Sequence, residues 1–334
     1  MKKRIRSIAA CAAAAGIVLA ALSAGWGAAA EAKAASAPVA GAKYGPDARK
    51  ETAAAFPFGI AEAADGGLMI ADQYHKAIWL EKEGKTLRYA GASGPEGLYG
   101  EPAGGYADGR LSSMEMKSPW DIIPYRDGYA VSDSENHVVR YLTPEGAKTL
   151  AGAGQEGFLD QMANHALFSM PSGLAADPEG NLYIADTGND AIRVMTPNGQ
   201  VSTCARGLSG PTGLVYYGGA LYAADTGNHR IVKIQDGEVT VLAGNGTAGY
   251  LNGSYSEASF QTPVQLAAAP DGTLYVSDTG NGVVRKLDPG TDGGVVTTLG
   301  GQDSSMVSPA GLLVKDESLY ICDSFMRKIY ILPR

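Results

Sequence analysis

An all-β fold, a six-bladed β-propeller of four-stranded antiparallel blades, is the class that the sequence predicts. The chain has 334 residues and 45 glycines, and only 19% of its residues are charged, which is typical of short strands joined by many turns. A strand that ends in aspartate recurs six times, and a proline opens a shorter apolar run before each copy. Such units, repeated around a ring, leave few exposed sheet edges.

The recurring aspartates mark the ends of the second strands and are Asp72, Asp133, Asp186, Asp225, Asp278 and Asp323. The prolines that open the first strands are Pro57, Pro119, Pro171, Pro211, Pro263 and Pro309. Six residues after each aspartate stands Ile or Val, which we assign to a third strand. The small residue before each aspartate, such as Ala185, suits close packing of one blade on the next.

The third unit shows all four strands. "SGLAAD" is the first strand and "LYIAD" the second, with the turn "PEGN" between them. After the turn "TGND" come "AIRVMT" and "VSTCA", the third and fourth strands. The predicted blades therefore cover about 56–91, 119–152, 171–206, 211–244, 263–301 and 309–332.

The sixth unit stops at Pro333 without a fourth strand. A matching segment without a unit before it, "SAPVAG" (36–41), stands at the other end of the chain. We therefore expect an N-terminal strand to complete the last blade, so that the two ends of the ring join and no edge is left unpaired.

Residues 1–34 are predicted to be a secretory signal peptide. Four basic residues stand among the first six, an apolar stretch runs from Ser7 to about Gly25, and small residues follow. The propeller, 35–334, is then expected to be secreted or at the cell surface and free of the membrane after cleavage. A retained membrane anchor is the alternative, because the apolar stretch approaches spanning length.

The formal net charge of −8 argues against nucleic acid as a partner, because that binding depends on positive charge. Loss of residues 1–34 would remove mostly basic residues and make the chain more acidic.

Two stretches carry a resemblance to a known family, "PSGLAADPEGNLYIADTGNDAIRVM" (171–195) and "PTGLVYYGGALYAADTGNHRIVKI" (211–234). Their P-x-G, L-Y-[IV]-[AS]-D and N-H-R-I patterns resemble the NHL-repeat family, of the secreted bacterial type. The resemblance covers essentially the whole chain after the leader and implies six blades. The second unit departs from the pattern because it lacks the P-x-G glycine, and the sixth lacks the Asn.

The six aspartates are predicted to be structural. A carboxylate at a strand end can accept backbone N–H groups of its own turn, and Gly188 is expected to supply the positive φ that this turn needs. Because every blade needs such a turn, a structural role predicts six copies, whereas a catalytic role predicts one or two. We assign no catalytic residue.

The resemblance also implies where a metal would lie in related enzymes. The amidating lyases hold zinc partly through the residue after the blade-opening proline, and the positions here are Phe58, Trp120, Ser172, Thr212, Val264 and Ala310, none a good zinc ligand. Gluconolactonase-like propellers hold calcium with inward carboxylates, for which only Asp121 and Glu62 qualify. We expect no cofactor and no metal ligand set, with a divalent cation such as calcium as the alternative.

Aromatic residues at the channel mouth and in the long connections are the better candidates for binding. The candidate ligand-binding residues are Phe58, Tyr99, Tyr106, Trp120, Asp121 and Tyr255. Phe158 and Tyr250 recur at one offset after Ala-Gly, and we expect that they only fix their own loops.

These observations predict an exported, monomeric, non-catalytic binding or scaffold propeller. Its ligand would be a protein or a carbohydrate at the cell envelope, bound on the face with the long connections 42–55, 92–117, 153–169 and 245–261. A metal-dependent lyase or lactone hydrolase that uses Asp121, Glu62 and loop residues is the alternative.

Overall fold

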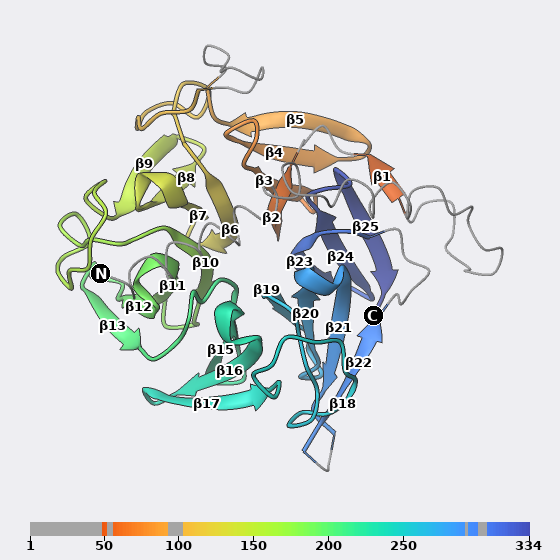
Figure 1. The fold of residues 1–334 in the computed structure, drawn as a ribbon. Coiled ribbons are helices and arrows are strands. Elements are labelled where there is room, and N and C mark those ends of the chain that lie inside the picture. The colour runs from red at the N-terminus through yellow and green to blue at the C-terminus, as the bar shows by residue number, and fades with distance from the viewer. Residues whose placement is uncertain (1–48, 52–55, 93–102, 291–292, 300–305) are drawn as a thin grey trace.

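Six antiparallel sheets surround a common axis, which confirms the predicted six-bladed β-propeller (Figure 1). The computed structural model describes residues 49–51, 56–92, 103–290, 293–299 and 306–334. The described helices are four 3-10 turns, at Ser134–Asn136 (η1), Thr187–Asn189 (η2), Thr226–Asn228 (η3) and Thr279–Asn281 (η4). Within these ranges no helix has the length and apolar character needed to cross a membrane.

Each blade is described from its innermost strand outward. Blade 1 consists of Pro57–Glu62 (β2), Leu68–Asp72 (β3), Ala77–Lys82 (β4) and Lys85–Ala90 (β5), and blade 2 of Pro119–Tyr125 (β6), Gly128–Asp133 (β7), Val138–Thr143 (β8) and Gly146–Ala151 (β9). Blade 3 consists of Pro171–Ala176 (β10), Leu182–Asp186 (β11), Ala191–Met195 (β12) and Val201–Ala205 (β13). The fourth blade consists of Leu214–Tyr217 (β14), Ala220–Asp225 (β15), Arg230–Gln235 (β16) and Glu238–Ala243 (β17). The fifth is Pro263–Ala268 (β19), Leu274–Asp278 (β20), Val283–Asp288 (β21) and Val295–Leu299 (β22), beside which lies Gly253–Ser254 (β18).

The sixth blade joins the two ends of the chain. Its first strands are Pro309–Lys315 (β23), Ser318–Asp323 (β24) and Lys328–Pro333 (β25), and its fourth strand is Arg49–Glu51 (β1), which pairs antiparallel with β25. An N-terminal strand thus closes the last blade, as predicted. The closing strand lies further along the chain than the predicted segment 36–41, which is outside the described residues.

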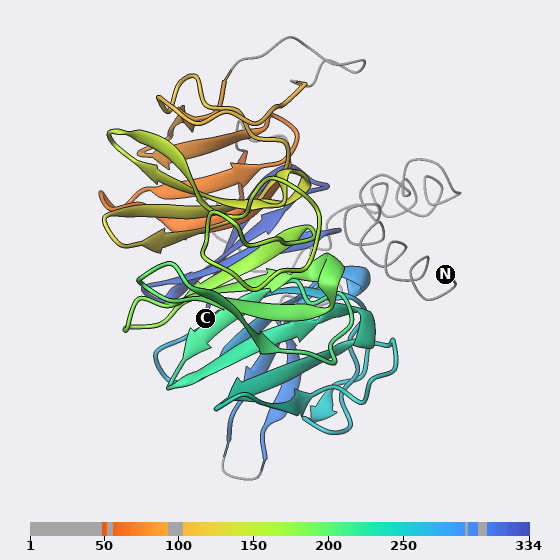
Figure 2. The ribbon, with the colours of Figure 1, turned by 90° about the vertical axis from the view of Figure 1, so that its left-hand side faces the viewer.

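The hydrophobic core lies between the blades, which stand side by side when the disc is viewed from its edge (Figure 2). One cluster combines Val139 of blade 2 with Leu174 and Ile184 of blade 3. The predicted small residue before each aspartate is fully buried, and these residues are Ala71, Ser132, Ala185, Ala224, Ser277 and Cys322. Small size there lets adjacent sheets pack closely.

Threonine hydroxyl groups join blades 3, 4 and 5 to the following blade at the turn after the aspartate. Thr187 Oγ1 donates to the carbonyl of Pro211 at 2.7 Å, and Thr226 Oγ1 donates to that of Pro263 at the same distance. Thr279 repeats the contact with Pro309. The turn of one blade therefore fixes the start of the innermost strand of the following blade.

The innermost strands approach closely two residues after the blade-opening proline, where four blades have glycine: Gly59, Gly173, Gly213 and Gly311. A Cβ atom at any of these positions would collide with the backbone of the neighbouring innermost strand. The two remaining blades carry Asp121 and Gln265, which face each other from opposite sides of the ring. Asp121 and Gln265 therefore meet across the axis, between the closely spaced glycine positions of the other four blades.

Asp121 is a buried carboxylate that joins three blades. Its Oδ2 accepts hydrogen bonds from Leu174 N at 2.9 Å and from Gln265 Nε2 at 3.1 Å, and its Oδ1 accepts one from Ile122 N at 2.9 Å. Burial raises the pKa of Asp121 to about 6, while the three N–H donors act in the opposite direction.

The Asp121 carboxylate predicts a specific pH dependence of stability. Because its pKa rises from 3.8 to about 6 on folding, its contribution to the free energy of unfolding is largest at low pH and is lost as the pH rises through about 6. We expect the Tm of Asp121→Asn, relative to wild type, to increase between about pH 4 and pH 7. Calorimetry across this range checks it, with exposed Asp236→Asn as the control; parallel curves would contradict the assignment.

Candidate functional site

Each recurring aspartate is fully buried and ties its blade's second strand to the segment that enters the first strand. Asp186 Oδ1 accepts Ser169 N at 2.7 Å, and Asp225 and Asp278 accept Ser209 N and Gln261 N at the same distance. In these three blades the aspartate does not cap its own turn. The carboxylate instead holds the backbone two residues before the blade-opening proline.

The expectation that Gly188 supplies a positive φ is wrong. The left-handed residue of that turn is Asp190, with φ 54°, whereas Gly188 is absent from the positive-φ residues. Gly188 is needed for a different reason, because a Cβ there would run into Ser169. The left-handed position also links blades: Asp190 Oδ1 accepts Gly210 N at 2.7 Å.

Two histidines occupy the same left-handed position and make the same link. His137 Nδ1 accepts Met170 N at 3.2 Å, and His229 Nδ1 accepts Thr262 N at 3.1 Å. Burial lowers the pKa of His137, which favours the neutral ring that can accept this bond.

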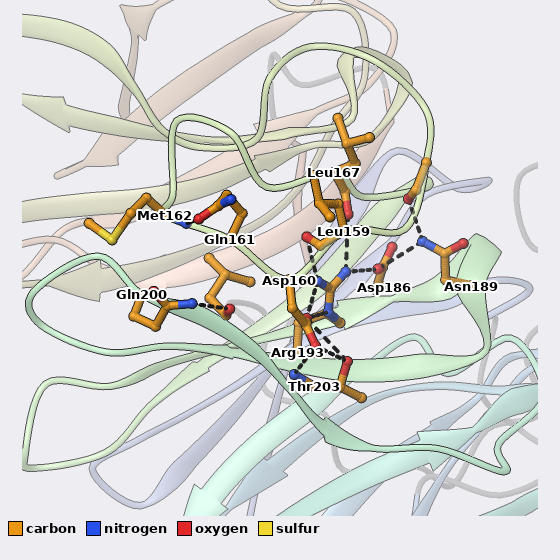
Figure 3. Close-up of polar contacts among 12 residues, drawn as sticks. Leu159, Asp160, Gln161, Met162, Leu167, Asp186, Asn189, Arg193, Gln200 and Thr203 are labelled. Carbon is orange, nitrogen blue, oxygen red and sulfur yellow. Dashed lines mark hydrogen bonds and ion pairs between the residues drawn. The ribbon is translucent and has the colours of Figure 1, made fainter.

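A buried arginine seven residues after the aspartate fixes a long connection in blade 3 (Figure 3). Arg193 Nη1 donates to Asp186 Oδ2 at 2.7 Å and to the carbonyl of Leu167 at 3.0 Å. Its Nη2 donates to the carbonyl of Leu159 at 2.9 Å and to Asp160 Oδ1 at 2.5 Å. One fully buried guanidinium therefore joins the structural aspartate to both ends of the loop.

Arg140 and Arg285 repeat the arrangement in blades 2 and 5. The acceptors of Arg140 are Asp133, Asp108 and the carbonyls of Ala107 and Glu115. Those of Arg285 are Asp278, Asn252 and the carbonyls of Leu251 and Ser259. In each long connection, part of these acceptors belongs to the sequence pattern Gly-aromatic-x-Asp/Asn. This pattern could have indicated the arginine contacts from the sequence, but it was not used.

The aromatic residue of each pattern lies over the guanidinium and remains partly open to solvent. Phe158 lies 4.4 Å from Arg193, Tyr106 lies 5.2 Å from Arg140, and Tyr250 lies 5.3 Å from Arg285. Their exposed fractions are 37%, 46% and 42% respectively. These rings therefore fix their loops and still present surface to solvent.

The long connections reach the outer edges of their blades. Asp160 Oδ2 accepts Thr203 N of the outermost strand β13 at 3.2 Å, and Asp108 Oδ2 accepts Thr149 N of β9 at 3.0 Å. In blade 5 the connection forms β18, which pairs with β22. We call the surface formed by the described residues 103–117, 153–169 and 245–261 the loop face.

Phe58 and Trp120 are placed together, but in the interior. Their ring centroids are 4.1 Å apart, and they form a buried cluster with Val264 of blade 5 and Ala310 of blade 6. Each ring is about one-twentieth exposed, at 6% and 5%. Their role in ligand binding stays a prediction.

The remaining candidates are dispersed. Tyr106 is on the loop face, and Tyr255 is half-buried after β18, where burial raises its pKa to about 12. Tyr99 lies outside the described residues. Asp121 is in the axial channel.

The geometry does not fit the calcium alternative. Asp121 already accepts three N–H donors, whereas Glu62 pairs with Lys315 Nζ at 2.9 Å at the far end of β2. A calcium ion needs six to eight converging oxygens. Of the six positions that lie two residues after the blade-opening prolines, four are glycines, which offer no side-chain oxygen. Within the described ranges no three His, Cys, Asp or Glu side chains are grouped to hold a metal ion.

Comparison with known proteins agrees with the repeat seen in the sequence. The NHL repeat family matches residues 168–195. Protein SUPPRESSOR OF QUENCHING 1, chloroplastic, of Arabidopsis thaliana is 27% identical over 281 residues, covering 72% of this chain and 26% of the relative. NHL repeat-containing protein 2 of Homo sapiens is 26% identical over 277 residues, covering 67% of this chain and 38% of the relative. The chain thus spans well under half the length of these relatives.

Solved structures agree on the fold. A Bacteroides thetaiotaomicron protein of unknown function aligns with a TM-score of 0.62 and 19% identity, covering 86% of this chain and 73% of that one. An auxiliary nutrient binding protein from the same organism gives 0.60 and 14%, covering 83% and 68%. Virginiamycin B lyase of Staphylococcus aureus gives 0.59 and 17%, covering 86% and 98%. The chain thus contains an NHL repeat at residues 168–195 and folds as a six-bladed β-propeller.

Proposed function

We propose that the protein is an exported, non-catalytic binding module that captures a protein partner at the cell envelope through its loop face. The observation that carries the proposal is an exposed apolar stretch on the loop of blade 3. Phe158, Leu159 and Met162 are 37%, 43% and 43% exposed. Solvent-facing apolar groups so close in sequence are typical of interaction surfaces.

The stretch is held in place before any ligand arrives. Arg193 binds the carbonyl of Leu159 from below, and Arg206 lies 4.2 Å from the Phe158 ring. A surface that is already ordered loses little conformational entropy on binding, which favours affinity. The loop of blade 5 is built similarly and exposes Tyr250 and Leu251.

The chemistry of the stretch favours a protein over a carbohydrate. Sugar rings stack on flat aromatic faces, whereas aliphatic Leu159 and Met162 offer no such face. Phenylalanine, methionine and arginine are enriched in protein–protein interfaces, and Phe158, Met162 and Arg206 provide that combination. Some proteins of similar fold are named as lyases or as a putative gluconolactonase, so the enzyme alternative is kept as an outcome of the test.

The first test replaces the apolar stretch with charge. Biotin-tagged wild-type protein is expected to enrich one or a few proteins from an envelope extract. Leu159→Asp combined with Met162→Asp should reduce their recovery at least about tenfold, because buried unpaired charge opposes interface formation. Leu87→Asp on blade 1, where Leu87 is also exposed, is the matched control and should bind like wild type.

The outcomes separate the ligand classes. Equal recovery by the double variant and wild type would exclude the blade 3 loop as the site. Retention on insoluble cell-wall polysaccharide that requires Phe158 would assign a carbohydrate ligand instead. Stoichiometric zinc or calcium in the purified protein, with chelator-sensitive turnover, would support the enzyme alternative.

A second test concerns the support beneath the stretch. Arg193→Met leaves the Asp186 carboxylate and the carbonyls of Leu159 and Leu167 without their cationic donor. Because this strands a buried charge, we expect the free energy of unfolding in urea to fall by about 3–5 kcal/mol. A loss below about 0.5 kcal/mol, the range of ordinary surface substitutions, would show that the arginine does not support the loop.

A further inference from the structure

The outermost strand of blade 4, β17, has an open edge, whereas connections cover the corresponding edges of blades 2, 3 and 5. In blade 3, Val201 N donates to the carbonyl of Gln161, and Thr203 N donates to Asp160. Val239 and Val241 hold the equivalent register positions in blade 4, since they face Ile234 and Val232 as Val201 and Thr203 face Met195 and Arg193. In the part of the chain that the structure describes, no hydrogen bond reaches the N–H of Val239 or of Val241 from outside the blade.

The edge is open because the connection that enters blade 4 is short. The connection into blade 4 from Arg206 to Gly210 is only a few residues long, so it cannot extend to the outer strand as the loops of blades 2, 3 and 5 do. The two anchoring residues are also missing. Val232 replaces the buried arginine, and Val241 replaces the threonine that faces it in blades 2, 3 and 5.

The chain itself shows that such an edge accepts an extended segment. In blade 5 the connection adds β18 antiparallel to β22, with Gly253 facing Val296 and Ser254 facing Val295. The equivalent edge of blade 4 is bare, and Val241 there is 53% exposed. Unpaired strand edges of this kind readily take up another strand unless lysine, proline or a bulge blunts them. β17, "EVTVLA", contains neither lysine nor proline, and its one register shift, at Leu242, lies beyond Val239 and Val241.

We propose that β17 pairs with β17 of a second copy of the chain, forming a two-fold antiparallel dimer. The strand is nearly symmetrical about Thr240. Pairing about a two-fold axis at Thr240 places Val239 opposite Val241 of the second copy and Thr240 opposite its counterpart. Glu238 then lies at the outer end of the pairing, so the only charge in the strand does not meet its own copy, and like charges opposite each other would have opposed pairing.

The proposed register uses the groups that are free. Val239 and Val241 would exchange the outward N–H and carbonyl bonds, while the two Thr240 residues would form a non-hydrogen-bonded pair with closely spaced side chains. A contact made by one strand buries less than the roughly 1,200 Å² typical of stable complexes, so the dimer is expected to be weak and concentration-dependent. It does not depend on the loop face, and it would replace the monomer expected from the sequence.

Sedimentation velocity from about 10 μM to 1 mM tests the association. Wild type is expected to shift from monomer to dimer across this range. Val241→Pro, which removes the outward N–H, and Val241→Lys, which adds a charge at the edge, should both remain monomeric. Val241→Thr keeps the N–H and should dimerise. A wild type that is monomeric throughout, or dimers of Val241→Pro and Val241→Lys as strong as wild type, would overturn the proposal.

A disulfide experiment tests the register. With Cys11 and Cys204 replaced by serine, Thr240→Cys should form an intermolecular disulfide under mild oxidation, because the two positions face each other across the axis. Ser202→Cys is the matched control, since Ser202 holds the same position on the covered edge of blade 3 and should remain unlinked. Equal crosslinking of the two variants, or none of Thr240→Cys, would contradict the register.

Discussion

A buried carboxylate at the end of each second strand is the interaction on which the blades depend. Removing a carboxylate from water is costly, and the cost is recovered only when hydrogen-bond donors surround it. At Asp186 the donors are Ser169 N, Asn189 Nδ2 and Arg193 Nη1, which come from three different parts of the chain. Satisfying one charge therefore fixes the entry to the first strand, the following turn and the third strand together.

The arginine that satisfies this carboxylate also explains the loop face. A guanidinium has five N–H donors, and one aspartate uses only some of them. In blade 3 the rest bind Leu159, Asp160 and Leu167, so the same buried cation that completes the blade orders a long connection. The apolar residues of that connection can be exposed without being mobile, because their backbone is held from beneath. The repeat motif and the loop face are thus connected by the hydrogen bonds of one arginine side chain.

The sequence was sufficient for the architecture because strand patterns and turn residues are local. Aspartate, proline and β-branched positions located every blade, and the missing fourth strand located the closure, although Arg49–Glu51 and not 36–41 lies beside β25. The contacts of the candidate site were harder to predict from the sequence. Arg193 contacts Leu159 34 residues away, and an isolated arginine in a strand suggests a solvent-exposed side chain. Phe58 and Trp120 were predicted to lie at the mouth of the channel, whereas their rings pack against each other between neighbouring blades.

Blade 4 shows that the arginine, its facing threonine and the long connection vary as one unit. An arginine at position 232 would be buried beside Asp225 with no loop carbonyls to accept its other N–H groups, and such unpaired donors are costly. A threonine at 241 would lack the loop carboxylate that Thr203 binds in blade 3. Once the connection is short, valine is the better residue at both positions, since it packs without polar demands. The short connection and these two valines also leave the outer strand of blade 4 with unpaired outward backbone groups and an exposed apolar side chain. The changes that stabilise the interior of blade 4 are therefore the same ones that favour the proposed association at its edge.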